Sequence, residues 1–450
     1  ITNSLVYDDG TNVGIGTTSP AQKLHINGGI ARFSNNSSNY LEIDGSDSAN
    51  NHAIISNRLN QLQFKTNTGA GAPHISLLPA TGGNVGIGTW GPAEKLDVLG
   101  KIAVNGQTAV YIPLGSFTGS SFYGDGGGSL SYVSGNDGRY NTGVGIGALF
   151  SNTTGGYNTA SGYQSLWKNT TGAGNVASGR ESLRYNTEGN YNVASGYQSL
   201  FSNTTGNHNV ASGSQSLKLN TTGSHNVASG YRSLYSNTTG SHNVASGREN
   251  LRSNTTGNYN VASGYRSLYS NTTGGSNVAS GRDSLRYNTT GGYNVASGDQ
   301  SLYTNTEGAH NVASGYQSLY LNTTGGFNVA SGYQSLYSNI TGSNNVAFGY
   351  RAGRYIANGS TANQTSGTSV YLGGATKALA DGGTNEIVIG YNAIGNGSNT
   401  VTLGNTSVTK TILQGNVGIG TTGPNFKLEV VGDSTSGILA VRNAANARDT

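Results

Sequence analysis

Cysteine and methionine are both missing from this chain of 450 residues. The lack of cysteine excludes a disulfide framework and any metal site built on thiolates. No apolar run approaches the roughly 20 residues of a membrane-spanning helix, so we expect no insertion into a bilayer. Because the chain opens at Ile1 rather than at a methionine, we expect a processed product or a fragment of a longer protein.

Charged side chains are scarce as well. Only 10% of the residues are charged, where about 25% is usual, and the formal net charge is +4. Disordered chains combine low hydrophobicity with high net charge and few aromatics, whereas this chain has 27 tyrosines. The composition therefore favours a packed structure with a small core. The weak basicity is spread along the sequence and indicates no nucleic acid or other acidic partner.

What the chain has in abundance is glycine, 72 residues of it, arranged with asparagine, serine and threonine in units of 17 residues. Twelve complete units and a degenerate thirteenth occupy residues 141–357. The units begin at Asn141, Asn158, Asn175, Asn192, Asn209, Asn226, Asn243, Asn260, Asn277, Asn294, Asn311, Asn328 and Asn345. Counting from these asparagines, positions five and fifteen are glycine throughout.

The period itself predicts a fold. Seventeen residues are too few for a pair of helices, which requires about 33 or more. Short runs with valine or tyrosine, separated by Asn-Thr-Thr-Gly, are typical of strands and turns. We therefore predict an all-β fold, a parallel β-solenoid or β-roll with one unit per coil and coils about 4.8 Å apart. Glycines are expected at tight corners that need positive φ.

Identical residues at identical positions predict what holds the coils together. Asparagines at positions one and twelve are expected to form two ladders of amide hydrogen bonds. Leucine at position nine, valine at position two and alanine at position three are expected to line a narrow interior. The candidate structural ladder comprises Asn152, Asn169, Asn186, Asn203, Leu166, Leu183 and Leu200.

Positions six and ten vary together between aromatic residues and arginine. An arginine coil therefore lies beside tyrosine coils, a spacing that suits cation–π contacts. Two interpretations stay open: a ladder that packs on itself or on a neighbouring chain, or a surface that binds glycans. The candidate residues are Tyr197, Tyr231, Tyr265, Tyr316, Tyr333, Arg180, Arg248 and Arg282.

Histidine occupies position seventeen of three consecutive units, as His208, His225 and His242. Such a column could bind a transition metal. The same column holds Tyr191 and Tyr259, however, so we interpret it as an aromatic ladder and assign neither a metal nor any other cofactor. The acidic residues of the array are scattered rather than paired as a glycan-cleaving enzyme requires, so we expect no catalytic residues and no enzymatic activity.

The flanks carry a different phrase. "NVGIGT" followed by "KL" begins at Asn12, Asn84 and Asn416, and each copy is expected to form a strand, a glycine turn, a proline corner and a second strand. A region from Asn385, "NEIVIGYNAIGNGSNTVTLGN", has the rhythm of a short β-coil. The expected domains are small β modules over 1–140, the solenoid over 141–357, and a β-roll-like segment with a third module over 358–450.

These phrases resemble those of long trimeric fibre proteins of bacteriophages and related bacterial surface proteins. The Asn385 region and "NVASG" are similar to head repeats of trimeric autotransporter adhesins. The resemblance implies a homotrimeric fibre, extracellular or on the virion surface, that attaches to a host cell through a surface glycan or receptor. From the residues alone, packing three chains together would bury apolar columns that one thin coil exposes.

Two other classes of protein stay open. One is a self-assembling extracellular filament or surface-layer protein, whose coils stack between subunits. The degenerate first unit, "NTGVGIGALF", and last unit, "NVAFGYRAGRYIANGST", are expected to cap the solenoid, which favours closed ends over a filament. The other is a lectin-like shaft that binds glycans along its tyrosine and arginine coils.

Overall fold

The computed structural model describes residues 6–15, 18–19, 24–26, 85–87, 96–98, 101–104, 107–111, 121–123 and 138–432. Every regular element in these ranges is a β-strand, so they contain no helix of the length and apolarity that crossing a membrane requires. The chain divides into two compact units, Ile1–Gly82 and Gly83–Thr450.

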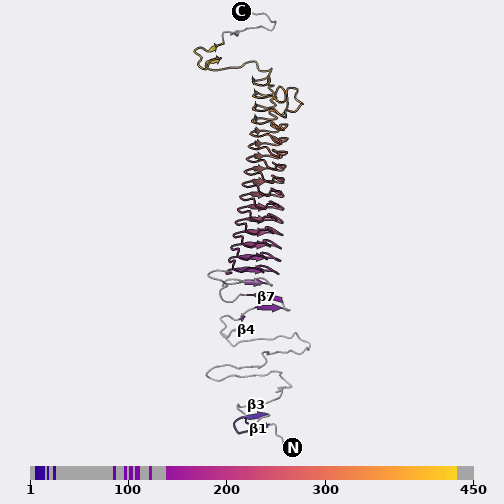
Figure 1. Ribbon diagram of the computed structural model, residues 1–450, viewed down its shortest axis with the longest axis vertical. Coiled ribbons are helices and arrows are strands. Elements are labelled where there is room, and N and C mark those ends of the chain that lie inside the picture. The colour runs from indigo at the N-terminus through magenta and orange to yellow at the C-terminus, as the bar shows by residue number, and fades with distance from the viewer. Residues whose placement is uncertain are drawn as a thin grey trace, which may run out of the picture. The chain divides into compact units, whose positions relative to one another are not determined.

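Each 17-residue unit contributes one three-residue strand to a parallel ladder (Figure 1). The strands are β9 (Thr142–Val144), β10 (Thr159–Ser161), β11 (Val176–Ser178), β12 (Val193–Ser195), β13 (Val210–Ser212), β14 (Val227–Ser229), β15 (Val244–Ser246), β16 (Val261–Ser263), β17 (Val278–Ser280), β18 (Val295–Ser297), β19 (Val312–Ser314), β20 (Val329–Ser331) and β21 (Val346–Phe348). From β11 to β20, neighbouring strands pair with identical residues opposite one another, as Val193 does with Val210. The predicted parallel β-solenoid with one repeat per coil is confirmed.

The ladder continues past both ends of the array. Before it, β8 (Ser121–Tyr123) pairs in parallel with β9, and β7 (Gln107–Tyr111) pairs antiparallel with both β8 and β6 (Lys101–Val104). After it come β22 (Val370–Leu372), β23 (Ile387–Ile389) and β24 (Val401–Leu403), each parallel to the last. The β-coil expected around Asn385 is therefore present. The expectation that the degenerate first and last units cap the solenoid is wrong, because further strands pair with both.

The interior of the solenoid is narrow and built from small residues. Alanine at position three and leucine at position nine are fully buried in coil after coil, as Ala228 and Leu234 illustrate. Valine at position two was expected beside them, but this is wrong: from Val176 to Val312 the valines are 38–40% exposed. Successive strand residues face opposite sides, so an inward alanine places the valine before it and the serine after it outside.

Two ladders of buried asparagine amides run through this interior. At position twelve, Asn169 Nδ2 donates to Asn152 Oδ1 at 2.6 Å, and the pattern repeats coil by coil through Asn186 and Asn203. At position one, Asn226 donates both its backbone N–H and its Nδ2 to Asn209 Oδ1, at 3.0 and 3.1 Å. Because the amides satisfy one another, a polar interior is stable without a thick apolar core.

The three "NVGIGT" segments share one strand arrangement. In each of them two short strands pair in parallel, β2 (Val13–Ile15) with β3 (Leu24–Ile26), β4 (Val85–Ile87) with β5 (Leu96–Val98), and β25 (Val417–Ile419) with β26 (Leu428–Val430). In the first segment, β1 (Val6–Asp8) adds an antiparallel strand to β2. Most of the modules expected over 1–140 lie outside the described residues.

Candidate functional site: a basic and aromatic ridge

The side chains at positions six, seven, ten and eleven of the units between residues 158 and 354 form one continuous strip, termed the ridge below. Position seven joins the columns at six and ten: the Arg232 guanidinium lies 5.0 Å from the ring centre of Tyr231 and 5.5 Å from that of Tyr235. Position eleven joins position ten: Lys168 Nζ lies 5.4 Å from the ring centre of Trp167. The four columns are therefore one surface rather than four separate stripes.

Arginine and tyrosine alternate along position six. Arg180 lies between Tyr163 and Tyr197, with its guanidinium 5.7 and 5.8 Å from the two ring centres. Arg248 lies between Tyr231 and Tyr265 at the same two distances. Each guanidinium therefore covers the faces of the rings before and after it, in the geometry of a cation–π contact.

Where arginine is absent, the tyrosines stack on one another. Tyr316, Tyr333 and Tyr350 follow each other at 5.2 and 5.4 Å between ring centres. A second stack at position ten joins Tyr320 to Tyr303 and Tyr337, at 4.9 and 5.0 Å. Tyr333 and Tyr320 are therefore covered on both ring faces by the neighbouring coils.

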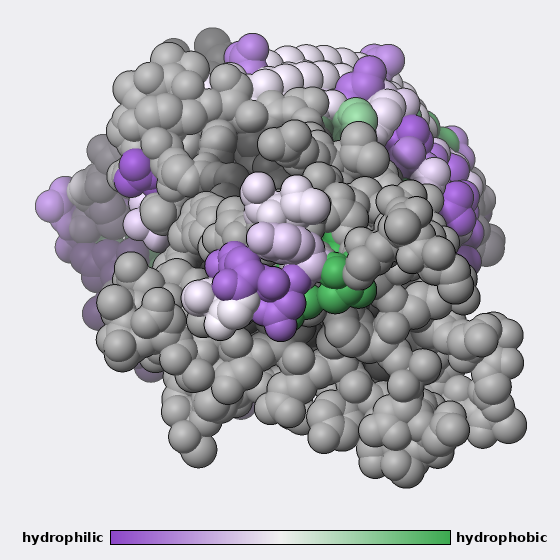
Figure 2. Space-filling model, turned by 90° about the horizontal axis from the view of Figure 1, so that it is seen from below, coloured by the Kyte–Doolittle hydropathy of each residue, from purple (hydrophilic) through white to green (hydrophobic). Residues whose placement is uncertain are grey.

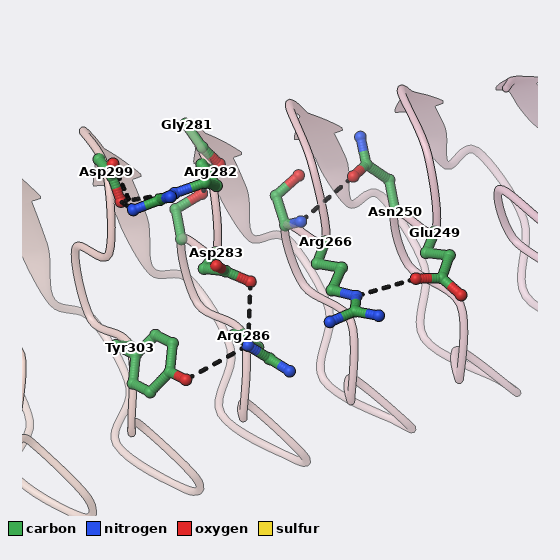
Figure 3. A network of polar contacts seen from close by, with 11 residues as sticks. Glu249, Asn250, Arg266, Gly281, Arg282, Asp283, Arg286, Asp299 and Tyr303 are labelled. Atoms are coloured by element: carbon green, nitrogen blue, oxygen red, sulfur yellow. Dashed lines mark hydrogen bonds and ion pairs between the residues drawn. The ribbon is translucent and has the colours of Figure 1, made fainter. Parts of the chain in front are cut away.

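Carboxylates hold several of the arginines in place (Figure 3). Arg266 Nε donates to Glu249 Oε2 at 2.8 Å, across one coil step. Arg282 pairs with Asp299 at 3.0 Å rather than lying between two tyrosines, which distinguishes it from Arg180 and Arg248. These pairs fix the direction of long side chains that would otherwise be free.

The local surroundings lower the pKa of Glu249 and raise that of Tyr320. Burial of Glu249 raises the pKa of its carboxyl, but the hydrogen bond from Arg266 and the charges of Arg248 and Arg252 outweigh burial and lower the pKa below its usual range. Burial raises the pKa of Tyr320, and the neighbouring tyrosines and Asp283 raise it further. These shifts favour the ionised carboxylate of Glu249 and the neutral phenol of Tyr320.

All twelve basic residues of the array lie on the ridge, together with only four of its six acidic residues. The basic residues are Lys168, Arg180, Arg184, Lys218, Arg232, Arg248, Arg252, Arg266, Arg282, Arg286, Arg351 and Arg354. The other two acids, Glu188 and Glu307, stand at position fourteen. The interpretation that basicity is spread without focus is therefore wrong for the array, because the coil register gathers it on one surface.

The three candidate metal-binding histidines stack face to face. The rings of His208 and His225 are 5.0 Å apart with 9° between their planes, and those of His225 and His242 are 4.9 Å apart with 5°. Parallel rings hold their in-plane nitrogens side by side instead of directing them at one ion. Tyr191 and Tyr259 continue the stack at its two ends, which makes an aromatic ladder. Within the described residues, no group of three or more His, Cys, Asp or Glu side chains is placed to hold a metal ion.

Sequence reasoning missed the part played by position seven. Gln198 Nε2 donates to Glu181 Oε2 at 2.9 Å, and Gln317 and Gln334 extend a similar chain from Gln300, each bond 2.8 Å long. The signal was present in the sequence, since position seven is polar or charged in every unit after the first.

No family model, curated protein or solved structure matches this chain.

Proposed function

We propose that this chain is a segment of a homotrimeric extracellular fibre that attaches a virus particle or a bacterium to a host cell or surface. The proposal combines two lines of support: the resemblance of the "NVGIGT" and "NVASG" phrases to trimeric fibre proteins, and a parallel solenoid suited to a stiff spacer. Hydrogen bonds join every coil of the array to the next, so bending would strain many bonds at once.

One observation carries the trimer: a long apolar strip on the outside of the strands. From β11 to β19 the valine column is 38–40% exposed. Beside it, two residues before most of these valines, stands a column of tyrosines and histidines, in which Tyr259 and Tyr293 are 62% exposed. Seen end-on, hydrophobic residues occupy only small areas of the described surface (Figure 2). Contiguous apolar strips are uncommon on monomers, and three copies packed about an axis would cover this one.

The test is the native mass of the purified chain, measured by light scattering. We expect a discrete particle of three chains, each of 46.1 kDa. A monomer would contradict the trimeric fibre, and polymers of indefinite length would replace it with the self-assembling filament.

Two matched variants locate the interface. Val210, Val244 and Val278 changed together to aspartate should convert the trimer to monomers, because three buried carboxylates per chain would lack partners. The control changes three exposed threonines at position fourteen to aspartate and should leave the trimer intact; these are Thr222, Thr256 and Thr290. Circular dichroism confirms in both cases that the solenoid is folded. If the valine variant and the threonine variant have the same native mass, the valine column is not the trimer interface.

A further inference from the structure

The ridge carries most of its net positive charge in its first eight coils. Over the eight coils from Asn158 to Tyr293 it carries ten basic side chains and three carboxylates, a net charge of +7. Glu188, the remaining acid of this stretch, lies at position fourteen and off the ridge. Since coils stand about 4.8 Å apart, this amounts to nearly one net positive charge per coil over about 38 Å.

The most accessible cations are held ready for a ligand. The side chain of Arg180 is 64% exposed although tyrosines lie against both faces of its guanidinium, and Arg248 and Lys168 are exposed too. Stacking orders these long side chains before any ligand arrives. Binding then costs less conformational entropy than it would for free side chains.

Many of the aromatic faces on the ridge are already covered. The rings of Tyr316, Tyr333 and Tyr350 stack on one another, and those of Tyr231 and Tyr265 lie against Arg248. Nucleobases bind single-strand platforms by stacking on open rings, and the covered rings offer no such platform. The groups left for recognition are guanidinium N–H and phenolic O–H donors, which suit carboxylates, sulfates and hydroxyl groups.

We propose that the ridge binds a linear acidic polysaccharide, laid along the coils with its anionic groups on the arginines and its hydroxyl groups on the tyrosines. The inference rests on the proposed attachment fibre and names the class of ligand that it recognises. A polysaccharide repeats an acidic sugar at a spacing similar to that of the coils, whereas duplex DNA packs one charge into about every 1.7 Å. Contacts at single coils are weak, and repetition over eight coils gives affinity by multivalency.

The experiment measures binding of the whole chain to four probes at low and at physiological salt. The probes are alginate, in which every sugar carries a carboxylate, heparin, which is sulfated, dextran, which is neutral, and an oligothymidylate. We expect binding to alginate or heparin, weakening as salt rises because exposed charges are screened. We expect none to dextran, and weaker binding to the oligothymidylate.

Two variants with the same change in net charge separate a site from general attraction. The ridge variant changes Arg180, Lys218 and Arg248 to glutamine, and its Kd for the acidic probe should rise about tenfold or more. The control variant changes Thr205, Thr222 and Thr239 to glutamate and should bind within about twofold of the original chain. Position fourteen tolerates glutamate, because Glu188 and Glu307 stand there already. Circular dichroism checks the fold of both.

Equal weakening of the two variants, unchanged binding by the ridge variant, or binding to dextran would each overturn the proposal. Tighter binding to the oligothymidylate would replace it with a nucleic-acid surface. The native mass tests the fibre proposal separately. A monomer that binds alginate through the ridge would support the polysaccharide ligand and contradict the trimeric fibre. A trimer that binds none of the acidic probes keeps the fibre and loses the ligand.

Discussion

An asparagine at position twelve makes three hydrogen bonds inside the solenoid. Asn220 Nδ2 donates to Asn203 Oδ1 at 2.8 Å and to the Gly223 carbonyl at 2.9 Å. Its own Oδ1 accepts from Asn237 Nδ2 at 2.7 Å. All of these residues are buried, so a hydrogen bond that is lost here leaves a polar group without a partner and destabilises the solenoid.

Replacing Asn220 with alanine should therefore destabilise the surrounding coils by at least about 2 kcal/mol, because buried donors and acceptors on three neighbours lose a partner. Hydrogen exchange followed by mass spectrometry measures this as lost protection across coils 192–242. The control is Thr222→Ala at an exposed position, which should change stability by less than about 0.5 kcal/mol. Equal loss of protection in the two variants would show that the ladder contributes little.

For single residues, the sequence predicts which residues stack on one another more readily than which side of the strand each one faces. Because residues 17 apart must stack, the asparagine ladders and the leucine column follow from the repeat itself. The outward direction of the valines does not follow from the repeat, since a period gives the spacing of equivalent residues but not the side that each residue faces. The serine at position four held the clue: it alternates with alanine, and so shares a face with valine.

Each coil turns its corners with left-handed residues, and most of these are not glycine. Leu234, Arg232 and His225 have φ of 50°, 53° and 58°, a conformation that costs an ordinary residue about 1–2 kcal/mol. The N–H of each one donates to a carbonyl of an adjacent coil. Neighbours therefore hold these corners in place, and a single coil would not keep its shape alone. Glycine supplies a positive-φ corner in every unit at position five only; at positions seven, nine and seventeen it does so in single units, as Gly147, Gly353 and Gly174.

Glycine at position fifteen is needed for space rather than for φ. A Cβ added to Gly240 would lie 2.5 Å from Asn237 Oδ1 and 2.6 Å from the Gly257 carbonyl oxygen. We expect Gly240→Ala to push the coils apart and lower the free energy of unfolding by about 1–3 kcal/mol, the usual cost of overpacking.

Thermal unfolding and hydrogen exchange across coils 226–259 measure this effect. The control is Gly292→Ala at position sixteen, which should be milder because Ala173 and Ala309 occupy that position naturally. If the control is as damaging as Gly240→Ala, lack of space at position fifteen is not the cause.

For the solenoid as a whole, we expect that one complete 17-residue unit can be removed without loss of the fold. Deleting residues 209–225 removes one complete coil and brings β12 against β14 with identical residues facing each other. The result should be a folded solenoid one coil shorter, by about 4.8 Å. Circular dichroism and thermal unfolding should differ little from those of the original chain.

Deleting residues 209–226 removes one residue more and should not be tolerated in the same way. The coil at the junction is then too short to close, and a slip of one residue sends each strand side chain to the opposite face. A lower unfolding temperature than for the 17-residue deletion is expected. Equal stability of the two deletions would mean that coil length is not what holds the register.

The arrangement of charge is also a property of the whole solenoid. A net charge of +4 over 450 residues conceals a surface on which every basic residue of the array lies together. The grouping depends on the coil closing at 17 residues, so it could be read from sequence only by writing the repeats beneath one another. The apolar strip is harder to predict, because one must also know which side of the strand the valines face. The aligned repeats alone do not give that direction.

The asparagine ladders give the solenoid a direction. Along position twelve from Asn169 to Asn322, each side-chain amide donates to the preceding coil and accepts from the following one. The ladder is therefore directional: its donors point toward the N-terminal end of the array and its acceptors toward the C-terminal end. A coil inserted anywhere in the array could continue the ladder only in the same chain direction, because a reversed coil would oppose one amide oxygen to another.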